Sequence, residues 1–144
     1  MKEITLLFIA GLIMVVNMYA RNITYETAGF KMDIDEKGLI ISIFDKSNNK
    51  EYLPAGQIVP LLSIRVNNEI EFPSQLKQKN NVLTLSFPSN KVDAQVKANS
   101  KTGYLSFELI GITRAETIEL IIWGPYPTTI SETIGECVGV VRNK

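Results

Sequence analysis

The sequence contains no histidine, and Cys137 is the only cysteine among its 144 residues. Zinc sites in proteins are built mainly from histidine and cysteine, so a site of these usual ligands is excluded. The same absence excludes a Ser-His-Asp or Cys-His nucleophile system, because each needs an imidazole to activate the nucleophile. We therefore expect no metal and no cofactor, and most hydrolase mechanisms are excluded for this chain alone.

A single cysteine also leaves the chain without an internal disulfide. Cys137 lies in a β-branched, glycine-spaced run, which predicts a small buried hydrophobic residue rather than a reactive thiol. A phosphate-binding loop is missing too, since Gly124, Gly135 and Gly139 do not follow its spacing and precede no predicted helix.

Neither sign of charge is in excess. The chain has 15 Lys and Arg against 15 Asp and Glu, and these residues are scattered singly among apolar ones. Proteins that bind nucleic acid carry a basic excess or a basic patch. The charge pattern therefore predicts an ordinary solvated surface and no nucleic-acid partner.

The first twenty residues differ from the rest of the chain. Lys2 precedes an apolar run over residues 4–16, and Ala20 ends a short, more polar stretch. This pattern predicts a secretory signal peptide over residues 1–20, cleaved after Ala20. A membrane-spanning helix needs about 20 apolar residues, and the run over residues 4–16 is shorter than that. No stable membrane span is therefore expected after the signal peptide is cleaved. We predict an exported protein, periplasmic, cell-surface or extracellular, with a single domain over residues 21–144.

From residue 22 onward the pattern is one of short strands separated by turn residues. Strand signals recur about every 8 to 12 residues, and no window keeps a helical period. Leu39, Ile41 and Ile43 are expected to share one face of a strand. The predicted strands are residues 30–35, 39–43, 61–66, 69–72, 75–79, 82–87, 92–98 and 105–109, with one helical turn at 113–116. This pattern predicts an all-β fold, an antiparallel β-sandwich.

The last quarter of the chain is rich in apolar residues. Residues 118–123 are β-branched and apolar, which predicts a buried strand with Trp123 in the core. The two prolines beside Tyr126 predict a stiff corner over residues 124–129. Residues 135–141 are predicted to form a further, glycine-spaced strand.

Aromatic residues and one arginine are the candidate ligand contacts. Sugar rings stack on flat aromatic faces, and arginine donates hydrogen bonds to their hydroxyl groups, so Tyr126, Arg142 and Trp123 form a candidate carbohydrate-binding set, with Tyr104 as a further aromatic. Packing in the core is the alternative role for each aromatic ring. Tyr126 is the strongest candidate, because its flanking prolines stiffen an exposed loop.

The acidic residues do not form a recognisable catalytic pair. A glycosidase needs two carboxyl groups about 5 to 10 Å apart, and nothing distinguishes the available glutamates from surface carboxylates. The glutamates concerned are Glu116, Glu119, Glu132 and Glu136. Residues 33–38 resemble the start of a calcium loop, but Lys37 stands where a ligand oxygen is needed. A polar strand face followed by a glycine turn is the better interpretation of this segment.

Residues 30–54 resemble the opening of the galactose mutarotase-like β-sandwich domains found at the front of many secreted bacterial glycoside hydrolases. The shared positions are Gly38, Ile41, Ser42, Ile43, Asp45, Lys50, Glu51 and Tyr52. Residues 123–143 are similar to a segment in the N-terminal domain of large exported proteins of the α-galactosidase-like type. The resemblance implies a supersandwich fold, present in part because such domains are usually longer. It also implies a noncatalytic, carbohydrate-associated role beside a catalytic domain that follows the C-terminus.

Two other classes of function stay open. The chain could be an independent periplasmic or surface adhesion module that binds a protein partner through a sheet edge or the proline corner. It could also be a complete small enzyme that uses only carboxylates.

Overall fold

The computed structural model describes residues 22–129. Within this range the secondary structure is eleven strands and one short 3-10 helix. The strands form three antiparallel sheets of order β1-β2-β3-β4, β10-β9-β8-β7 and β11-β5-β6, which confirms the predicted all-β antiparallel sandwich. The elements are β1 (Ile23–Glu26), β2 (Phe30–Ile34), β3 (Ile40–Asp45), β4 (Lys50–Glu51), β5 (Leu62–Val66), β6 (Glu69–Glu71), β7 (Gln75–Lys79), β8 (Val82–Phe87), β9 (Val92–Ser100), β10 (Leu105–Ile112), η1 (Ala115–Thr117) and β11 (Leu120–Trp123).

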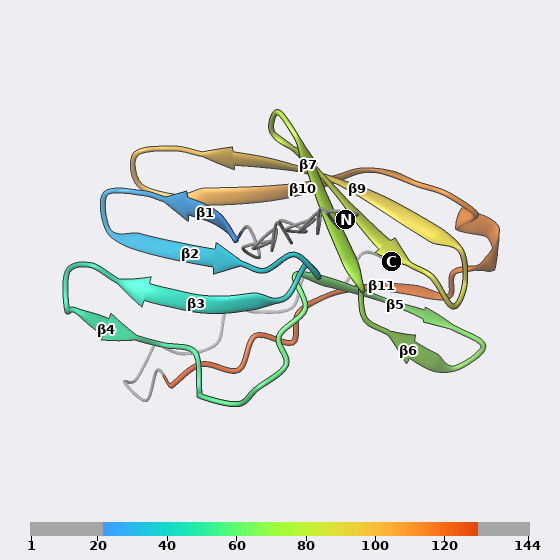
Figure 1. Ribbon diagram of the computed structural model, residues 1–144, viewed down its shortest axis with the longest axis horizontal. Coiled ribbons are helices and arrows are strands. Elements are labelled where there is room, and N and C mark those ends of the chain that lie inside the picture. Colours follow the sequence, from blue (N-terminus) through green and yellow to red (C-terminus); the bar gives the residue numbers. More distant parts are fainter. Residues whose placement is uncertain (1–21, 130–144) are drawn as a thin grey trace, which may run out of the picture.

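The two long strands β9 and β10 run along the length of the molecule, with the β1–β4 sheet near one end and the β5–β6 hairpin near the other (Figure 1). Contacts tie the separate sheets together. The Tyr25 ring on β1 meets the Phe107 ring on β10 edge to face, with ring centres 5.7 Å apart. The backbone N–H of Leu76 on β7 donates to the carbonyl of Glu36, in the turn between β2 and β3.

The core follows the period-two pattern of the sequence. Alternate apolar residues of β8 and β9 are completely or almost completely buried, and the residues between them are polar, which gives each strand one inward face. The buried positions of these two strands are Leu83, Leu85, Phe87, Val92, Ala94, Val96 and Ala98. The apolar residues of β5 complete the core from the third sheet.

The predicted common face of Leu39, Ile41 and Ile43 is wrong. Asp33 pairs with Ser42 and Ile34 pairs with Ile40, so the register shifts there and Ile41 is the extra residue of a bulge. A bulge breaks the strict alternation of a strand. Ile40 is consequently buried while Ile41 is 45% exposed.

The turn between β2 and β3 explains the acidic segment and its glycine. One carboxylate oxygen of Asp35 accepts hydrogen bonds from the backbone N–H groups of Lys37 and Leu39, at 2.9 and 2.8 Å. Gly38 has a φ of 89°, and a Cβ at this position would collide with Leu85. The carboxylate therefore shapes a turn, and the glycine allows this turn to lie directly on the core.

Two of the residues that carry the family resemblance hold the β3–β4 hairpin together. Asp45 accepts hydrogen bonds from the backbone N–H groups of Ser47 and Asn48. Glu51 accepts them from the Ser42 hydroxyl and the Ile43 N–H, at 2.6 and 2.8 Å. Hydrogen bonding, led by the Asn48 side chain, lowers the pKa of Asp45. The contacts of Asp45 and Glu51 therefore stabilise the β3–β4 hairpin.

The prediction of a buried strand over residues 118–123 is also wrong. β11 pairs only with β5, so it is an edge strand of the sheet that the described residues form. Trp123 is 41% exposed rather than buried in the core. The apolar sequence of this segment resembles that of an interior strand, but its position in the sheet leaves one side without a described neighbour.

Two smaller differences concern the elements at the ends of the described range. The single helical turn occurs as η1, two residues beyond the start expected at residue 113. β1 was not predicted. Its backbone pairs with β2, and the Thr24 hydroxyl donates to Asp33 at 2.6 Å.

Candidate functional site

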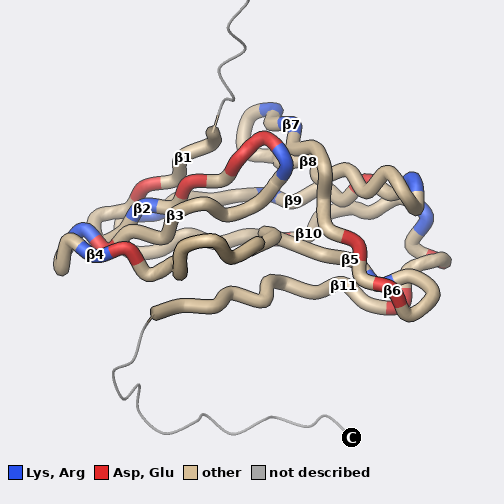
Figure 2. Tube along the Cα trace, turned by 60° about the horizontal axis from the view of Figure 1, so that its bottom comes forward, with Lys and Arg blue, Asp and Glu red and all other residues tan. Residues whose placement is uncertain are grey.

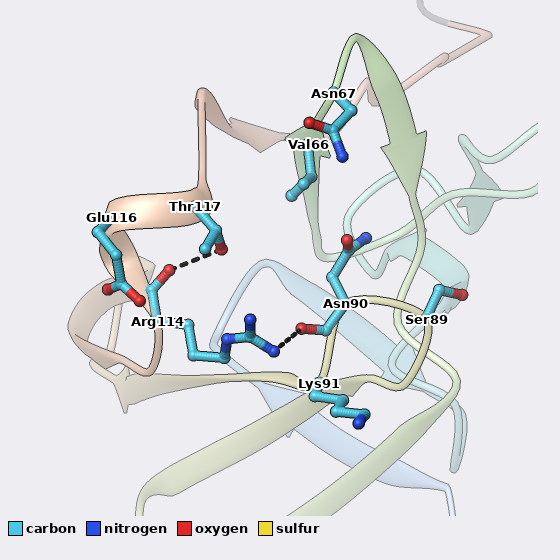
Figure 3. A pocket seen from close by; sticks show the side chains of 8 residues that line it. All are labelled: Val66, Asn67, Ser89, Asn90, Lys91, Arg114, Glu116 and Thr117. Carbon is cyan, nitrogen blue, oxygen red and sulfur yellow. Dashed lines mark hydrogen bonds between the residues drawn. The ribbon is translucent and has the colours of Figure 1, made fainter.

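Three turns from different strand pairs meet around a polar hollow of about 460 Å³, which we call the loop pocket (Figure 3). One turn joins β5 to β6, the second joins β8 to β9, and the third leads from β10 into η1. The lining residues are Val66, Asn67, Ser89, Asn90, Lys91, Arg114, Glu116 and Thr117. All but Val66 are polar or charged.

Backbone conformation places several of these side chains. Asn67, Lys91 and Arg114 have φ values of 51°, 54° and 52°, in the left-handed region that residues with a Cβ seldom adopt. Asn67 and Asn68 both have positive φ, as a two-residue hairpin turn requires. Left-handed non-glycine residues cost about 1 to 3 kcal/mol each and cluster at functional sites. Three left-handed residues of this kind border the loop pocket.

Hydrogen bonds fix the β8–β9 turn on one side of the loop pocket. The carboxylate of Glu71 on β6 accepts hydrogen bonds from the Ser89 N–H at 2.8 Å and from the Asn90 amide at 2.7 Å. From the opposite side, the Arg114 guanidinium donates to the Asn90 carbonyl at 3.1 Å. The β8–β9 turn is therefore held between β6 and the turn that follows β10, by contacts that need no ligand.

The helical turn η1 closes the other side. The hydroxyl of Thr117 donates to the carbonyl of Arg114 at 2.9 Å, which fixes the short helix against the start of the turn. In Figure 3, Asn67 points into the hollow from the β5–β6 turn, while the Arg114 side chain runs along its lower border to the Asn90 carbonyl. Hydrogen-bonding groups from the three turns thus face the same space.

The pocket carries two cations and one anion. Lys91, Arg114 and Glu116 all line it, and no pair among them is an ion pair. Within the described residues, the side chains of Asn67, Lys91 and Glu116 make no hydrogen bond or ion pair. The pocket therefore offers donors and acceptors that the fold itself does not use.

Tyr126 lies elsewhere, in the wall of an apolar cavity of about 190 Å³ between the β1–β4 sheet and β10. The residue is 41% exposed, and its hydroxyl donates to the carbonyl of Leu61 at 2.7 Å. Partial burial raises the pKa of this hydroxyl. The apolar residues around it are Phe30, Met32, Ile40, Ile43, Leu61, Leu105 and Phe107.

The other predicted contacts are not gathered at one point. Trp123 is exposed on β11, three residues before Tyr126, and Tyr104 is 59% exposed in the β9–β10 turn. None of these three aromatic residues lines the loop pocket. Arg142 and Cys137 lie outside the described residues. The sequence-derived set of Tyr126, Arg142 and Trp123 stays a prediction.

The glutamates have different surroundings. Glu116 lines the loop pocket, whereas Glu119 forms an ion pair with Arg65 at 3.0 Å and accepts a hydrogen bond from the Asn68 N–H. Glu132 and Glu136 lie outside the described residues. No group of three potential metal ligands occurs within residues 22–129. No helix in the described part of the chain is long and apolar enough to cross a membrane.

Sequence patterns did not identify the loop pocket. Its residues appear in the sequence as ordinary turn residues, and only the Asn67-Asn68 and Ser89-Asn90 pairs mark where two of the turns occur. The third turn, at Arg114, contains neither glycine nor asparagine. Which turns meet depends on the packing of the sheets.

No protein-family model, curated protein or solved structure matches this chain. The galactose mutarotase-like resemblance therefore stays a prediction.

Proposed function

We propose that this protein is a noncatalytic, carbohydrate-binding β-sandwich domain that takes a saccharide into the loop pocket. The observation that supports the proposal is the convergence of polar side chains from three turns on one preformed hollow. Small-molecule sites commonly measure about 300 to 1,000 Å³ and are mostly apolar. The loop pocket has a suitable volume of about 460 Å³ but a polar lining, so a ligand rich in hydroxyl groups fits it best.

The chemistry of the lining suits sugar hydroxyls, which act as donors and acceptors at once. Asn67 supplies an amide with both functions, Arg114 and Lys91 supply donors, and Glu116 supplies an acceptor. Among the described lining residues Glu116 has the only carboxylate, whereas glycoside hydrolysis uses a pair. This supports binding without catalysis.

The signal-like pattern of residues 1–20 and the family resemblance extend the proposal. We place the protein outside the cytoplasm, as an accessory domain of an exported glycoside hydrolase. The sugar-binding function would then bring a catalytic domain close to its substrate.

Affinity-gel retardation and glycan-array binding test the loop pocket. Asn67→Gly keeps the left-handed backbone, because glycine adopts it without strain, and removes the amide from the hollow. One lost hydrogen bond of about 0.5 to 1.5 kcal/mol should weaken binding about two- to tenfold. The matched control is Asn80→Gly, since Asn80 has a φ of 55° in the β7–β8 turn and does not line the pocket.

A second variant, Tyr126→Ala, separates the two candidate sites. Loss of retardation in Asn67→Gly alone supports the loop pocket. Loss in Tyr126→Ala with unchanged binding by Asn67→Gly would move the site to the corner after β11. Absence of any glycan binding by the unmodified protein would refute the carbohydrate function itself.

A further inference from the structure

The free edge of β11 differs from every other sheet edge in the described part of the chain. The edge strands are β1, β4, β6, β7, β10 and β11. Each of the other five carries at least one charged residue, and β10 also has a bulge, whereas β11 reads Leu-Ile-Ile-Trp. In Figure 2, β11 is tan along its length. Charges, prolines and bulges are the devices by which proteins prevent edge pairing, and β11 contains none of them.

The side chains of β11 are also incompletely covered. Ile121 and Trp123 stand opposite Ile64 and Leu62 of β5 and therefore share the core-side face of the sheet. Both β5 residues are fully buried, but Ile121 and Trp123 are 37% and 41% exposed. The sheet thus ends with apolar side chains that extend its buried face outward.

We propose that β11 pairs in an antiparallel arrangement with β11 of a second copy of this chain, joining the two three-stranded sheets into one. The argument for this partner is complementarity. The β11 edge of a second copy is equally uncharged and apolar, whereas the other edge strands of the described chain carry charged residues. This surface is separate from the loop pocket, so the inference is independent of the proposed carbohydrate function.

Two-fold symmetry limits the possible registers. Opposite residues of an antiparallel pair point to the same face, so a symmetric pair must be centred on one residue. Centring on Ile122 places Ile121 of each copy opposite Trp123 of the other. Centring on Ile121 would instead place Glu119 opposite Trp123, although Glu119 is already held by Arg65. Apolar and aromatic cross-strand pairs stabilise a sheet, so the register centred on Ile122 is favoured.

A shallow recess beside β11 supports this register. It measures about 140 Å³ and is lined by Ile112, Ala115, Ile118, Glu119, Leu120 and Ile121. In the register centred on Ile122, the indole of each partner lies opposite Ile121, which is one of the residues that line this recess. Trp123 of each copy then gains apolar contacts beyond those that residues 22–129 of its own chain supply.

Sedimentation velocity of the purified protein over a concentration series measures the association. We expect a reversible dimer whose Kd rises at least about tenfold in Trp123→Lys, because a cation is then buried in the joint sheet on each side. The matched control is Ile70→Lys, which adds the same charge at a 57% exposed position of β6, on the other edge of the same sheet. Its Kd should stay unchanged.

Cysteine cross-linking tests the register, in a Cys137→Ser background. Residues opposite each other on the two-fold axis have Cα atoms about 4.5 to 5.5 Å apart, within the range of a disulfide. Oxidation should therefore link Ile122→Cys into dimers and leave Ile121→Cys largely monomeric. A monomer up to about 1 mM, or preferential linkage through Ile121→Cys, would overturn the proposal. It would also be overturned if dimers formed only after removal of residues 130–144, because the chain's own end would then cover the edge.

Discussion

Two tyrosine-to-phenylalanine substitutions should change the stability of this protein in opposite directions. Each removes one hydroxyl group and leaves the ring in place. The Tyr25 hydroxyl is buried and has no hydrogen-bond partner among the described residues. The Tyr126 hydroxyl donates to the carbonyl of Leu61 at 2.7 Å. The pair therefore compares an unsatisfied polar group with a satisfied one in the same fold.

The magnitudes follow from the cost of burying a polar group. An unsatisfied buried hydroxyl costs about 1 to 3 kcal/mol, so Tyr25→Phe should raise the free energy of unfolding by about 1 kcal/mol. Tyr126→Phe loses a neutral hydrogen bond and leaves the buried Leu61 carbonyl without that donor, which should lower it by about 1 kcal/mol. In a domain of this size each change shifts Tm by about 4 °C.

The pH dependence gives the same comparison a second readout. Burial raises the pKa of Tyr25 to about 12. The folded protein then keeps this proton at pH values where the unfolded chain, with a tyrosine pKa of about 10, has lost it. The stability that depends on the neutral Tyr25 is present below pH 10 and is lost as the pH rises toward 12. The advantage of Tyr25→Phe over the unmodified protein should therefore widen above pH 10.

Urea denaturation at pH 7 and at pH 10 to 11 measures both effects. Circular dichroism reports the transition, and equal m-values show that the variants unfold to similar states. If Tyr25→Phe is destabilised as much as Tyr126→Phe, the Tyr25 hydroxyl has a hydrogen-bond partner and the reasoning is refuted.

Two further predictions concern the turns around β3. Gly38→Ala should lower the free energy of unfolding by about 2 to 4 kcal/mol, because the alanine would have a left-handed backbone and would collide with Leu85. Gly56→Ala should lower it by about 1 kcal/mol, because Gly56 also has a positive φ, of 77°, but has open space around it. Gly103→Ala has neither problem and should be within about 0.5 kcal/mol of the unmodified protein; equal losses at all three glycines in thermal unfolding would contradict this ranking. Hydrogen bonds from Asn48 and nearby backbone groups lower the pKa of Asp45, so the stability they give is present above about pH 4 and is lost as the pH falls through the lowered value. Asp45→Asn should flatten this acid dependence in denaturation curves between about pH 2 and 5, and an unchanged slope would show that Asp45 does not contribute to it.

The sequence was most informative where one strand has one buried face. Residues 82–87 and 92–98 are correctly predicted as strands, and their alternation matches the buried residues of β8 and β9, because a two-residue period records which side of a strand meets the core. The Asn67-Asn68 pair is likewise a local turn signal that agrees with the structure, since asparagine tolerates the left-handed backbone that such turns need. These signals are local and need no knowledge of the neighbouring strands.

The sequence pattern predicted burial wrongly where strand pairing was irregular or one-sided. A bulge at Ile41 reversed the face of that residue, and the position of β11 at a sheet edge exposed Trp123 despite its apolar surroundings in the sequence. An apolar strand has the same composition whether it has one neighbour or two. Burial therefore depended on strand order, which no residue of β11 records by itself.

Composition and local pattern alone determined that the described chain is an antiparallel β protein with these turns, and they excluded histidine-dependent chemistry, because both depend only on which residues are present and how they alternate. Tertiary structure decided where the chemistry lies. It brought Asn67, Asn90 and Arg114 from three separate turns to one hollow, and it left one uncharged edge of β11 without a partner strand among residues 22–129. Both features arise from contacts between segments far apart in the sequence, and such contacts are set by the packing of whole sheets.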